Sequence, residues 1–460
     1  MGAAAVTAVC DDDHVTDLDQ LTNETVELLQ ALIRNQCVND GTPESGHEER
    51  SARLLENELE GTGVDIERFT LAPGRDSIVA RWSGTDPDAP ALCLMGHTDV
   101  VPVSPDGWTH DPFGGELIDG EVWGRGAVDM LNLTASMTVV FRHLLQSGRR
   151  YPGDIVYFAV ADEEAGGKLG AGPLVDTEWD ALRCDYVLTE FGGTPLHSDD
   201  GTSILVTTAE KGIGWRRLTV KGSPGHGSAP WGRDNALIKA AEVVRRLHEY
   251  APAPRLDERW GARIKAMGLP EDLSRRLLDP GALRDALGEL PLETAALAHS
   301  CTHTTFSPNV VSGGVKTNVI PDRVVIEVDI RTLPGETHDD VEAHLRAALG
   351  NLIDHVDVEV IQEDPSTSSP IDNPLWDALV ASMRNVYPGA AVIPSIVTGG
   401  TDSRFFRNRG AVAYGAGLLS PAVDFNEFWR RFHGHDERID VESLRLTTGL
   451  WLDVIDRLWT

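Results

Sequence analysis

Short, continuous apolar runs that end in polar sequence constrain the fold of this 460-residue chain most strongly. They span residues 91–95, 155–160, 186–188 and 204–206, and helical patterns lie between them. Strands that are apolar along their whole length are typical of parallel sheets that helices cover on both faces. We therefore expect an α/β fold with a mostly parallel sheet.

The pattern changes near Glu210. From there, apolar residues alternate with polar ones, which predicts a sheet with one covered face; the clearest case is Val324, Ile326, Val328 and Ile330. An amphipathic helix accompanies this pattern, with an apolar face made of Leu237, Ala240, Ala241, Val244 and Leu247. Residues 251–300 are polar and interrupted by prolines, and they predict a helical insertion.

These changes predict a discontinuous domain organisation. Residues 1–209 and 366–460 would form one α/β domain. Residues 210–365 would form a smaller α+β domain inserted into it, with the helical insertion as a part of the smaller domain.

Acids and histidines follow the apolar runs at the points where the strands are expected to end. His97 and Asp99 follow the first run, Glu163 and Glu164 the second, and Glu190 the third. Ligands of open α/β sheets bind at the carboxyl ends of the strands, so these residues are candidate site residues. Each motif alone is also compatible with a histidine in a surface turn or with an acidic loop.

Two further motifs complete a candidate metal site. Asp129 lies in a glycine-flanked turn before a helix, and His433 begins the sequence His-Gly-His-Asp-Glu. Together with His97, Glu164 and Glu190, they would suit two divalent ions about 3.5–4 Å apart with one bridging carboxylate. Imidazole and carboxylate ligands favour Zn²⁺, with Co²⁺ or Mn²⁺ as alternatives.

The order of these motifs resembles the dinuclear zinc metallopeptidase and amidohydrolase family of aminoacylase, succinyl-diaminopimelate desuccinylase, acetylornithine deacetylase and glutamate carboxypeptidase. The resemblance spans about residues 90–440. It rests on Gly96-His97-Thr98-Asp99-Val100-Val101-Pro102, Trp123-Gly124-Arg125-Gly126-Ala127-Val128-Asp129-Met130, Asp162-Glu163-Glu164, Gly225-His226-Gly227-Ser228, Asn318-Val319-Ile320-Pro321-Asp322, Asp329-Ile330-Arg331 and His433-Gly434-His435-Asp436-Glu437. The resemblance implies a zinc-exopeptidase-like catalytic domain with an inserted lid and dimerisation domain.

The resemblance also implies a role for each metal-site residue. Asp129 would bridge the ions, His97 and Glu190 would hold one, and Glu164 and His433 would hold the other. Asp99 would orient His97, and Glu163 would be the general base. His433 is chosen over His435 because His435 falls on a variable position of the family's pattern. The chain departs from the family at Leu131-Asn132, where a lysine is common, so contacts with the substrate can differ there.

In the inserted domain, the resemblance implies a homodimer and residues that reach the substrate. His226 would stabilise the oxyanion in the partner subunit's active site, and its alternative is a surface-loop histidine. Arg331 would capture a substrate carboxylate, although it shares its strand face with Glu327 and Asp329 and can instead form an ion pair there. The remaining candidate substrate contacts are Asn318, Gly400 and Thr401.

Charge and cysteine content narrow the function classes further. The chain has 40 Lys and Arg against 72 Asp and Glu, a net charge of −32, which argues against partners such as nucleic acid or anionic membranes. No apolar run approaches the length of a membrane span. The five cysteines show no Cys-x-x-Cys pair, and the first ten residues lack the basic region of a signal peptide. We therefore expect a cytoplasmic protein.

The resulting prediction is a metal-dependent hydrolase that cleaves amide bonds in N-acyl amino acids or in dipeptides with a free carboxylate. Within the family, Glu rather than Asp at position 190 accompanies acylases and carboxypeptidases rather than aminopeptidases. Hydrolysis of an ester or carbamate at the same site, and an inactive binding paralogue, remain alternatives.

Overall fold

The structure is a computed structural model that describes residues 12–198 and 201–460. The ten N-terminal residues in which we expect no signal peptide lie outside the described residues. Within the described part of the chain, no helix combines the length and hydrophobicity needed to cross a membrane.

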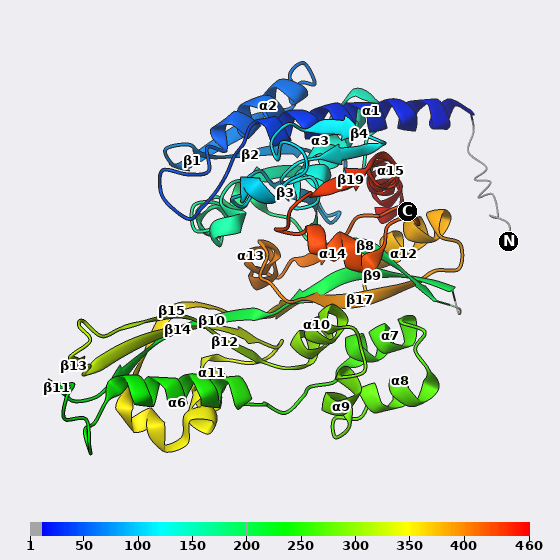
Figure 1. The fold of residues 1–460 in the computed structure, drawn as a ribbon. Coiled ribbons are helices and arrows are strands. Elements are labelled where there is room, and N and C mark those ends of the chain that lie inside the picture. The colour runs from blue at the N-terminus through cyan, green and yellow to red at the C-terminus, as the bar shows by residue number, and fades with distance from the viewer. Residues whose placement is uncertain (1–11, 199–200) are drawn as a thin grey trace.

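The main sheet has ten strands and is mostly parallel at its centre (Figure 1). Its order is β1 (Ile66–Ala72), β2 (Arg75–Trp82), β6 (Ile155–Val160), β3 (Leu92–His97), β7 (Tyr186–Thr189), β18 (Val412–Gly415), β9 (Gly201–Glu210) and β16 (Thr367–Ser368), and β8 (Gly192–Ser198) and β17 (Ala391–Val397) pair with β9. Strands β6, β3, β7 and β18 run parallel to their neighbours in that order. All six residues of β3 and of β6 are buried, which confirms the parallel sheet expected from the apolar runs.

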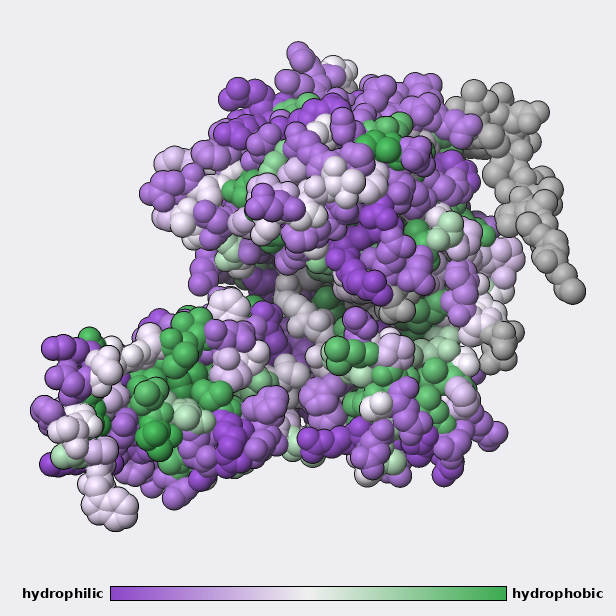
Figure 2. Space-filling model, in the orientation of Figure 1, coloured by the Kyte–Doolittle hydropathy of each residue, from purple (hydrophilic) through white to green (hydrophobic). Residues whose placement is uncertain are grey.

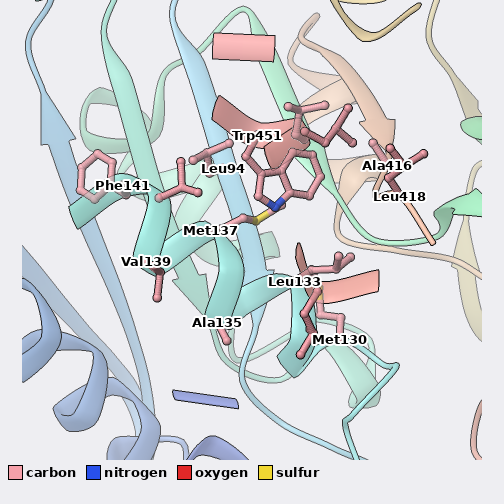
Figure 3. Close-up of a cluster of buried hydrophobic side chains, with 14 of the residues drawn as sticks. Leu94, Met130, Leu133, Ala135, Met137, Val139, Phe141, Ala416, Leu418 and Trp451 are labelled. Carbon is pink, nitrogen blue, oxygen red and sulfur yellow. The ribbon is translucent and has the colours of Figure 1, made fainter. Parts of the chain in front are cut away.

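Helices cover both faces of the main sheet. One face carries α1 (Asp12–Arg34), α2 (Glu49–Leu59), α3 (Leu131–Gln146), α12 (Pro374–Val386) and α15 (Val441–Leu458), and the other carries α4 (Ala171–Thr177), α5 (Trp179–Leu182) and α13 (Ser403–Asn408). The core of the first face surrounds Trp451, which is fully buried and donates a hydrogen bond from Nε1 to Ser136 Oγ (2.9 Å). Figure 3 shows its indole among Leu133, Met137 and Leu418.

A second, antiparallel sheet lies beside the main one, as expected after Glu210. Its order is β12 (Thr305–Gly313), β14 (Arg323–Thr332), β10 (Gly212–Lys221) and β15 (Val356–Asp364), and α6 (Ala236–Glu249) and α11 (His338–Leu349) cover one face. The alternating residues Val324, Ile326, Val328 and Ile330 are all buried. The prediction for Leu237 was wrong. It is 50% exposed because the buried face of α6 is rotated about the helix axis relative to the expected one: it is formed by Ala236, Ala240, Val243 and Leu247, and Leu237 and Ala241 lie outside it.

The expected insertion is helical and has a small core of its own around Trp260. It contains α7 (Glu258–Ala266), α8 (Glu271–Leu277), α9 (Leu283–Leu287) and α10 (Leu292–Thr302). The remaining elements are α14 (Phe425–Arg431), the sheet of β4 (Glu116–Ile118), β5 (Glu121–Trp123) and β19 (Arg438–Asp440), the pair β11 (Gly225–His226) and β13 (Val319–Ile320), and the 3₁₀ turns η1 (Pro105–Gly107), η2 (Glu163–Ala165) and η3 (Gly350–His355).

Candidate metal centre

The carboxyl ends of three neighbouring parallel strands bring the expected residues together. His97 is the last residue of β3, Glu163 and Glu164 begin the η2 turn after β6, and Glu190 follows β7. Because adjacent parallel strands end at the same edge of a sheet, the short apolar runs place these side chains next to one another. Asp129, just before α3, and His433, after α14, reach the same place from distant parts of the chain.

The two carboxylate oxygens of Asp129 face two different histidines. Oδ1 lies 3.4 Å from His97 Nε2, and Oδ2 lies 3.2 Å from His433 Nε2. Each histidine has one further carboxylate beside it: Glu190 Oε2 is 3.6 Å from His97 Nε2, and Glu164 Oε2 is 3.3 Å from His433 Nε2. The arrangement therefore has two halves that share Asp129.

These distances match the separation of ligands around a metal ion. Donor atoms bound at about 2.0–2.2 Å to one tetrahedral zinc lie about 3.3–3.6 Å from one another. His97 Nε2, Glu190 Oε2 and Glu164 Oε1 are buried and have no hydrogen-bond partner in the described part of the chain. Buried polar atoms ordinarily have a partner, so these three are suited to bind an ion.

The charges of the cluster also fit divalent ions. Glu163 is a fourth carboxylate, with an oxygen within 4.8 Å of ligand atoms of both His97 and Glu190. Burial raises the pKa of Glu190 to about 8 and that of Glu164 to about 7. Hydrogen bonds to Asp129 and Glu164 raise the pKa of His433 to about 10. Protons are thus retained to offset crowded negative charge, and two divalent cations would balance four carboxylates in their place.

A fifth carboxylate, that of Asp99, holds the η2 turn against β3. Its Oδ1 and Oδ2 accept hydrogen bonds from the backbone N–H groups of Glu163 (3.3 Å) and Glu164 (3.1 Å). The imidazole of His97 lies closer to the backbone carbonyl of Asp99 (3.0 Å from Nδ1) than to its carboxylate (3.5 Å). The hydrogen bond to the imidazole is therefore made by the backbone carbonyl of Asp99, where the sequence suggested its carboxylate.

Glu437 holds Asp129 in a similar way. Its Oε1 accepts hydrogen bonds from the backbone N–H groups of Val128 (2.8 Å) and Asp129 (3.1 Å), and its Oε2 binds Arg125 Nη1 (2.7 Å). Glu437 is fully buried, so its ion pair with Arg125 is shielded from solvent. The C-terminal motif therefore provides both His433 and the side chain that fixes the shared carboxylate. The ring of His435 faces Gly107 instead, away from this cluster.

A pocket of about 890 Å³ opens beside the cluster, between the main sheet and the second sheet. Figure 2 shows a hollow between the two parts of the molecule on this face. Asp129, Glu163, Glu164 and His433 line the pocket from one side, and Arg331, Trp215 and Gln362 line it from the second sheet. Its volume is in the range of sites that bind small molecules.

Arg331 faces this pocket and is also part of an ion pair. Its Nε donates to Asp329 Oδ1 (2.7 Å), and its guanidinium lies over the ring of Trp215, 5.6 Å from the ring centroid. Trp215 Nε1 donates to the same Asp329 oxygen (2.8 Å). The ion pair expected for Arg331 is therefore present and is formed with Asp329. The capture of a substrate carboxylate stays a prediction, for which the guanidinium has donors left.

The other candidate substrate residues lie in different places. His226 and Asn318 are exposed on β11 and just before β13, and neither lines the pocket. Gly400 lines the pocket, but the backbone N–H and hydroxyl of Thr401 donate to the buried Glu210 Oε2 (2.6 and 2.9 Å). Thr401 therefore anchors the loop that carries Gly400 to the main sheet and does not face the pocket itself.

Several residues of the site were missed by the sequence analysis. The Asn39 amide donates to Asp99 Oδ2 (2.8 Å) and to Asp162 Oδ1 (3.2 Å), which joins the strand-end loops. Arg75 binds Glu48 (2.7 Å) behind them, and both are buried. Arg404 lines the pocket and donates to the Gly166 carbonyl (2.8 Å). Position after a strand pointed to the candidate ligands, but these partners come from helix ends, a hairpin and loops with no comparable signal.

The chain is similar in sequence to known hydrolases. Aminoacylase-1 of Sus scrofa is 28% identical over 420 residues, which cover 90% of both chains. The N-fatty-acyl-amino acid synthase/hydrolase PM20D1 of Xenopus tropicalis is 29% identical over 395 residues, covering 83% of this chain and 75% of the relative.

Solved structures share the fold at low sequence identity. The M20 family metallo-carboxypeptidase Sso-CP2 from Sulfolobus solfataricus has a TM-score of 0.70 at 19% identity, with coverage of 95% of this chain and 99% of that chain. Human carnosine dipeptidase 1 has a TM-score of 0.68 at 18% identity, with coverage of 97% and 98%. Residues 93–457 match the profile of peptidase family M20/M25/M40, and the match covers the strand-end motifs, the second sheet and the C-terminal histidine motif. The chain belongs to peptidase family M20/M25/M40.

Proposed function

We propose that this protein is a dinuclear metal-dependent hydrolase that cleaves the amide bond of N-acyl amino acids or of dipeptides with a free carboxylate. The observation that carries the proposal is Asp129, whose two oxygens each face a separate histidine and carboxylate pair. A dinuclear metal-binding peptidase of the same family from Bacillus subtilis shares the fold, with a TM-score of 0.61, and supports it.

In this proposal, His97 and Glu190 hold one ion, Glu164 and His433 hold the other, and Asp129 binds both. Zn²⁺ is the first candidate because nitrogen and oxygen donors at this spacing suit its tetrahedral coordination, and Co²⁺ and Mn²⁺ are alternatives. The His433 side chain is 55% exposed, so its half of the centre faces the pocket from which a substrate would arrive.

The bound ions would lower the pKa of a water molecule and polarise the substrate carbonyl. Glu163 lines the pocket beside the cluster, and as general base it would take a proton from the attacking water. As the C–N bond breaks, the same carboxyl group would return the proton to the leaving amine. Asp99 fixes the backbone on which Glu163 is carried, so it holds the base in position.

The substrate class follows from the charges of the pocket and from the relatives. Arg331 offers a cation at the pocket wall for a substrate carboxylate. Similar proteins are named aminoacylase, probable carboxypeptidase and dipeptidase, and these names describe the hydrolysis of such substrates. We also propose a cytoplasmic location, because Cys37, Cys93, Cys184 and Cys301 are buried thiols without disulfides, as is usual in reducing compartments.

A substrate screen with the metal-loaded protein tests the function. We expect N-acetyl-L-amino acids and dipeptides to be cleaved much faster than amino-acid anilides with a free amine. Preference for leucine anilide would contradict the assignment of an acylase or carboxypeptidase. Faster cleavage of matched esters or carbamates would show that the enzyme is an ester or carbamate hydrolase instead. A metal-loaded protein that is inactive on all of these compounds would be a binding paralogue.

Glu163→Gln should bind two metal ions per chain and lose most of its turnover. Removal of a general base typically lowers the rate by about 10²–10⁴-fold, and the glutamine keeps the size of the side chain. Metal content by elemental analysis and kcat on an N-acetyl amino acid measure the two effects. Glu164→Gln is the matched control at the neighbouring position and should lower metal content. Near-normal activity of Glu163→Gln would remove Glu163 from the mechanism.

Arg331→Ala should lower kcat/KM for carboxylate substrates by about 10²-fold or less. A charge-assisted hydrogen bond contributes about 1.5–3 kcal/mol, and Asp329 already shares the guanidinium. The same variant should change the hydrolysis of a carboxamide analogue far less. Arg323→Ala, on the same strand and exposed, is the control. An equal loss of kcat/KM on both substrates would show that Arg331 contributes only to the structure of the pocket.

We further propose that residues 210–365 form a lid and dimerisation domain inserted between catalytic residues 1–209 and 366–460. The first boundary falls one residue before the end of β9 of the main sheet, just ahead of β10 of the second sheet, and the last falls between β15 and β16. In a homodimer, His226 and Asn318 would reach the partner subunit's active site, which accounts for their exposure in one chain.

The dimer should form through the outer side of this domain. Strand β12 is an edge strand with Val310 and Val311 exposed, and α6 packs beside it with Leu237 and Ile238 exposed. Figure 2 shows hydrophobic side chains gathered over this part of the molecule. Contiguous exposed apolar residues mark interaction sites.

Light scattering in moderate salt should therefore give twice the mass of one chain, and the double variant Ile238→Glu, Val311→Glu should be a monomer. Leu292→Glu changes an exposed leucine outside this surface and is the control, which should stay dimeric. A monomeric wild-type protein with full activity would contradict both the dimer and the role of His226 in the partner subunit.

A further inference from the structure

Three aromatic side chains stack on one another in the pocket wall, and we call this group the aromatic shelf: Phe191, Trp429 and Phe432. The rings of Phe191 and Trp429 are nearly parallel, at 8° and 6.3 Å between centroids. Phe432 stacks on both, at 5.3 Å from Phe191 and 4.9 Å from Trp429. All three are only partly buried and line the pocket.

The aromatic shelf is attached directly to the metal cluster. Phe191 follows Glu190 in the chain, and Phe432 precedes His433, so two of the rings are carried by neighbours of candidate ligands. A group joined to a carbonyl at the cluster would therefore lie against the shelf.

The backbone of Phe191 is held in an unusual conformation. Its φ is +66°, in the left-handed region that bulky residues rarely adopt, and its carbonyl accepts a hydrogen bond from the Thr207 hydroxyl. Such strain persists only where the surroundings determine the conformation, and it concentrates at functional sites. The phenyl ring is thus fixed at the pocket wall.

Behind the aromatic shelf the space is small. A cavity bounded by Phe191, Trp429, Leu205, Leu297 and Ile396 has room of about 20 Å³, which is little more than one water molecule occupies. A long alkyl chain therefore does not fit into this cavity, while a flat group can lie against the side of the rings that lines the larger pocket.

We propose that the aromatic shelf is the acyl subsite of this enzyme and selects an aryl acyl group, such as phenylacetyl, over acetyl and over long alkyl chains. This inference rests on the proposed function and adds the substrate's acyl side to it. Arg331 binds the carboxylate from the second sheet, while the shelf belongs to α14 and the strand ends, so the two ends of the substrate meet different walls. Offset stacking of aromatic rings adds to the free energy of burying them.

The reaction remains the hydrolysis described above. The C–N bond breaks, the water oxygen forms the new C–O bond, and the proton held by Glu163 goes to the amine. The products are an aryl carboxylic acid and a free amino acid.

The test compares N-phenylacetyl, N-octanoyl and N-acetyl derivatives of one L-amino acid with the metal-loaded protein. We expect kcat/KM for the phenylacetyl compound to exceed both others by about tenfold or more, and hydrophobic pockets discriminate on this scale. Equal or higher values for the octanoyl or acetyl compound would overturn the inference and leave the proposed function intact. Failure to cleave all three would count against the proposed function itself.

Variants of Trp429 separate a role in specificity from a role in structure. Trp429→Ala should reduce the phenylacetyl-to-acetyl ratio of kcat/KM to about threefold or less, and Trp429→Phe should restore most of the preference. Phe428→Leu is the matched control: Phe428 is buried, touches Phe432 edge-on and does not line the pocket. Its ratio should stay at the wild-type value, and an unchanged ratio in Trp429→Ala would overturn the proposal.

Binding provides a readout that is independent of turnover. Calorimetry with Glu163→Gln should show tighter binding of the phenylacetyl than of the acetyl compound by about tenfold, and Trp429→Ala in the same background should remove the difference. Equal affinities of the two compounds for Glu163→Gln would contradict an acyl subsite on these rings.

Discussion

Mutual repulsion among carboxylates is the constraint on which the rest of this structure depends. Asp129, Glu163, Glu164 and Glu190 lie together at one edge of a sheet that is buried on both faces. Burial disfavours their charged forms and raises the pKa of most of them, while hydrogen bonds from His433 and His97 outweigh burial at Asp129 and lower its pKa. Such an edge is stable only if cations or protons balance the charge and if the surrounding loops hold the acids together.

The loops are held by further acids rather than by basic residues alone. Asp99 accepts the N–H groups of the η2 turn, and Glu437 accepts those before α3. Each of these two carboxylates is satisfied by a neutral or cationic partner, Asn39 for Asp99 and Arg125 for Glu437. A side chain that accepts hydrogen bonds from two backbone N–H groups fixes the loop more rigidly than a charge pair at a single atom, and the neighbouring carboxylates of the cluster are positioned with that precision.

The sequence predicted the parts of the fold that depend on pattern. Continuous apolar strands and the polar residues after each one were sufficient to locate His97, Glu164 and Glu190 at one edge of the sheet, because the carboxyl ends of adjacent parallel strands lie at the same edge. The supporting residues could not be predicted, since Asn39 and Arg75 meet only through tertiary folding. Leu237 misled the helix prediction because two adjacent apolar stripes fit the periodicity of this helix, and the one that packs on the sheet contains Ala236 and Val243 rather than Leu237 and Ala241.

The position of Arg331 relative to the cluster of acids and histidines depends on the point where the chain passes from the main sheet to the second sheet. Glu210 ends β9 in the main sheet, where its buried carboxylate accepts hydrogen bonds from Thr401, in the loop that lines the pocket, and from Thr367 of the returning chain (2.5 Å). Lys211 follows it and donates from Nζ to the carbonyl of His303 (2.7 Å) at the start of β12. Both sides of the crossing are therefore anchored in buried contacts. The wall that carries Arg331 and the loop that carries Gly400 share this anchor, so a change in the angle of the second sheet must alter both sides of the pocket together.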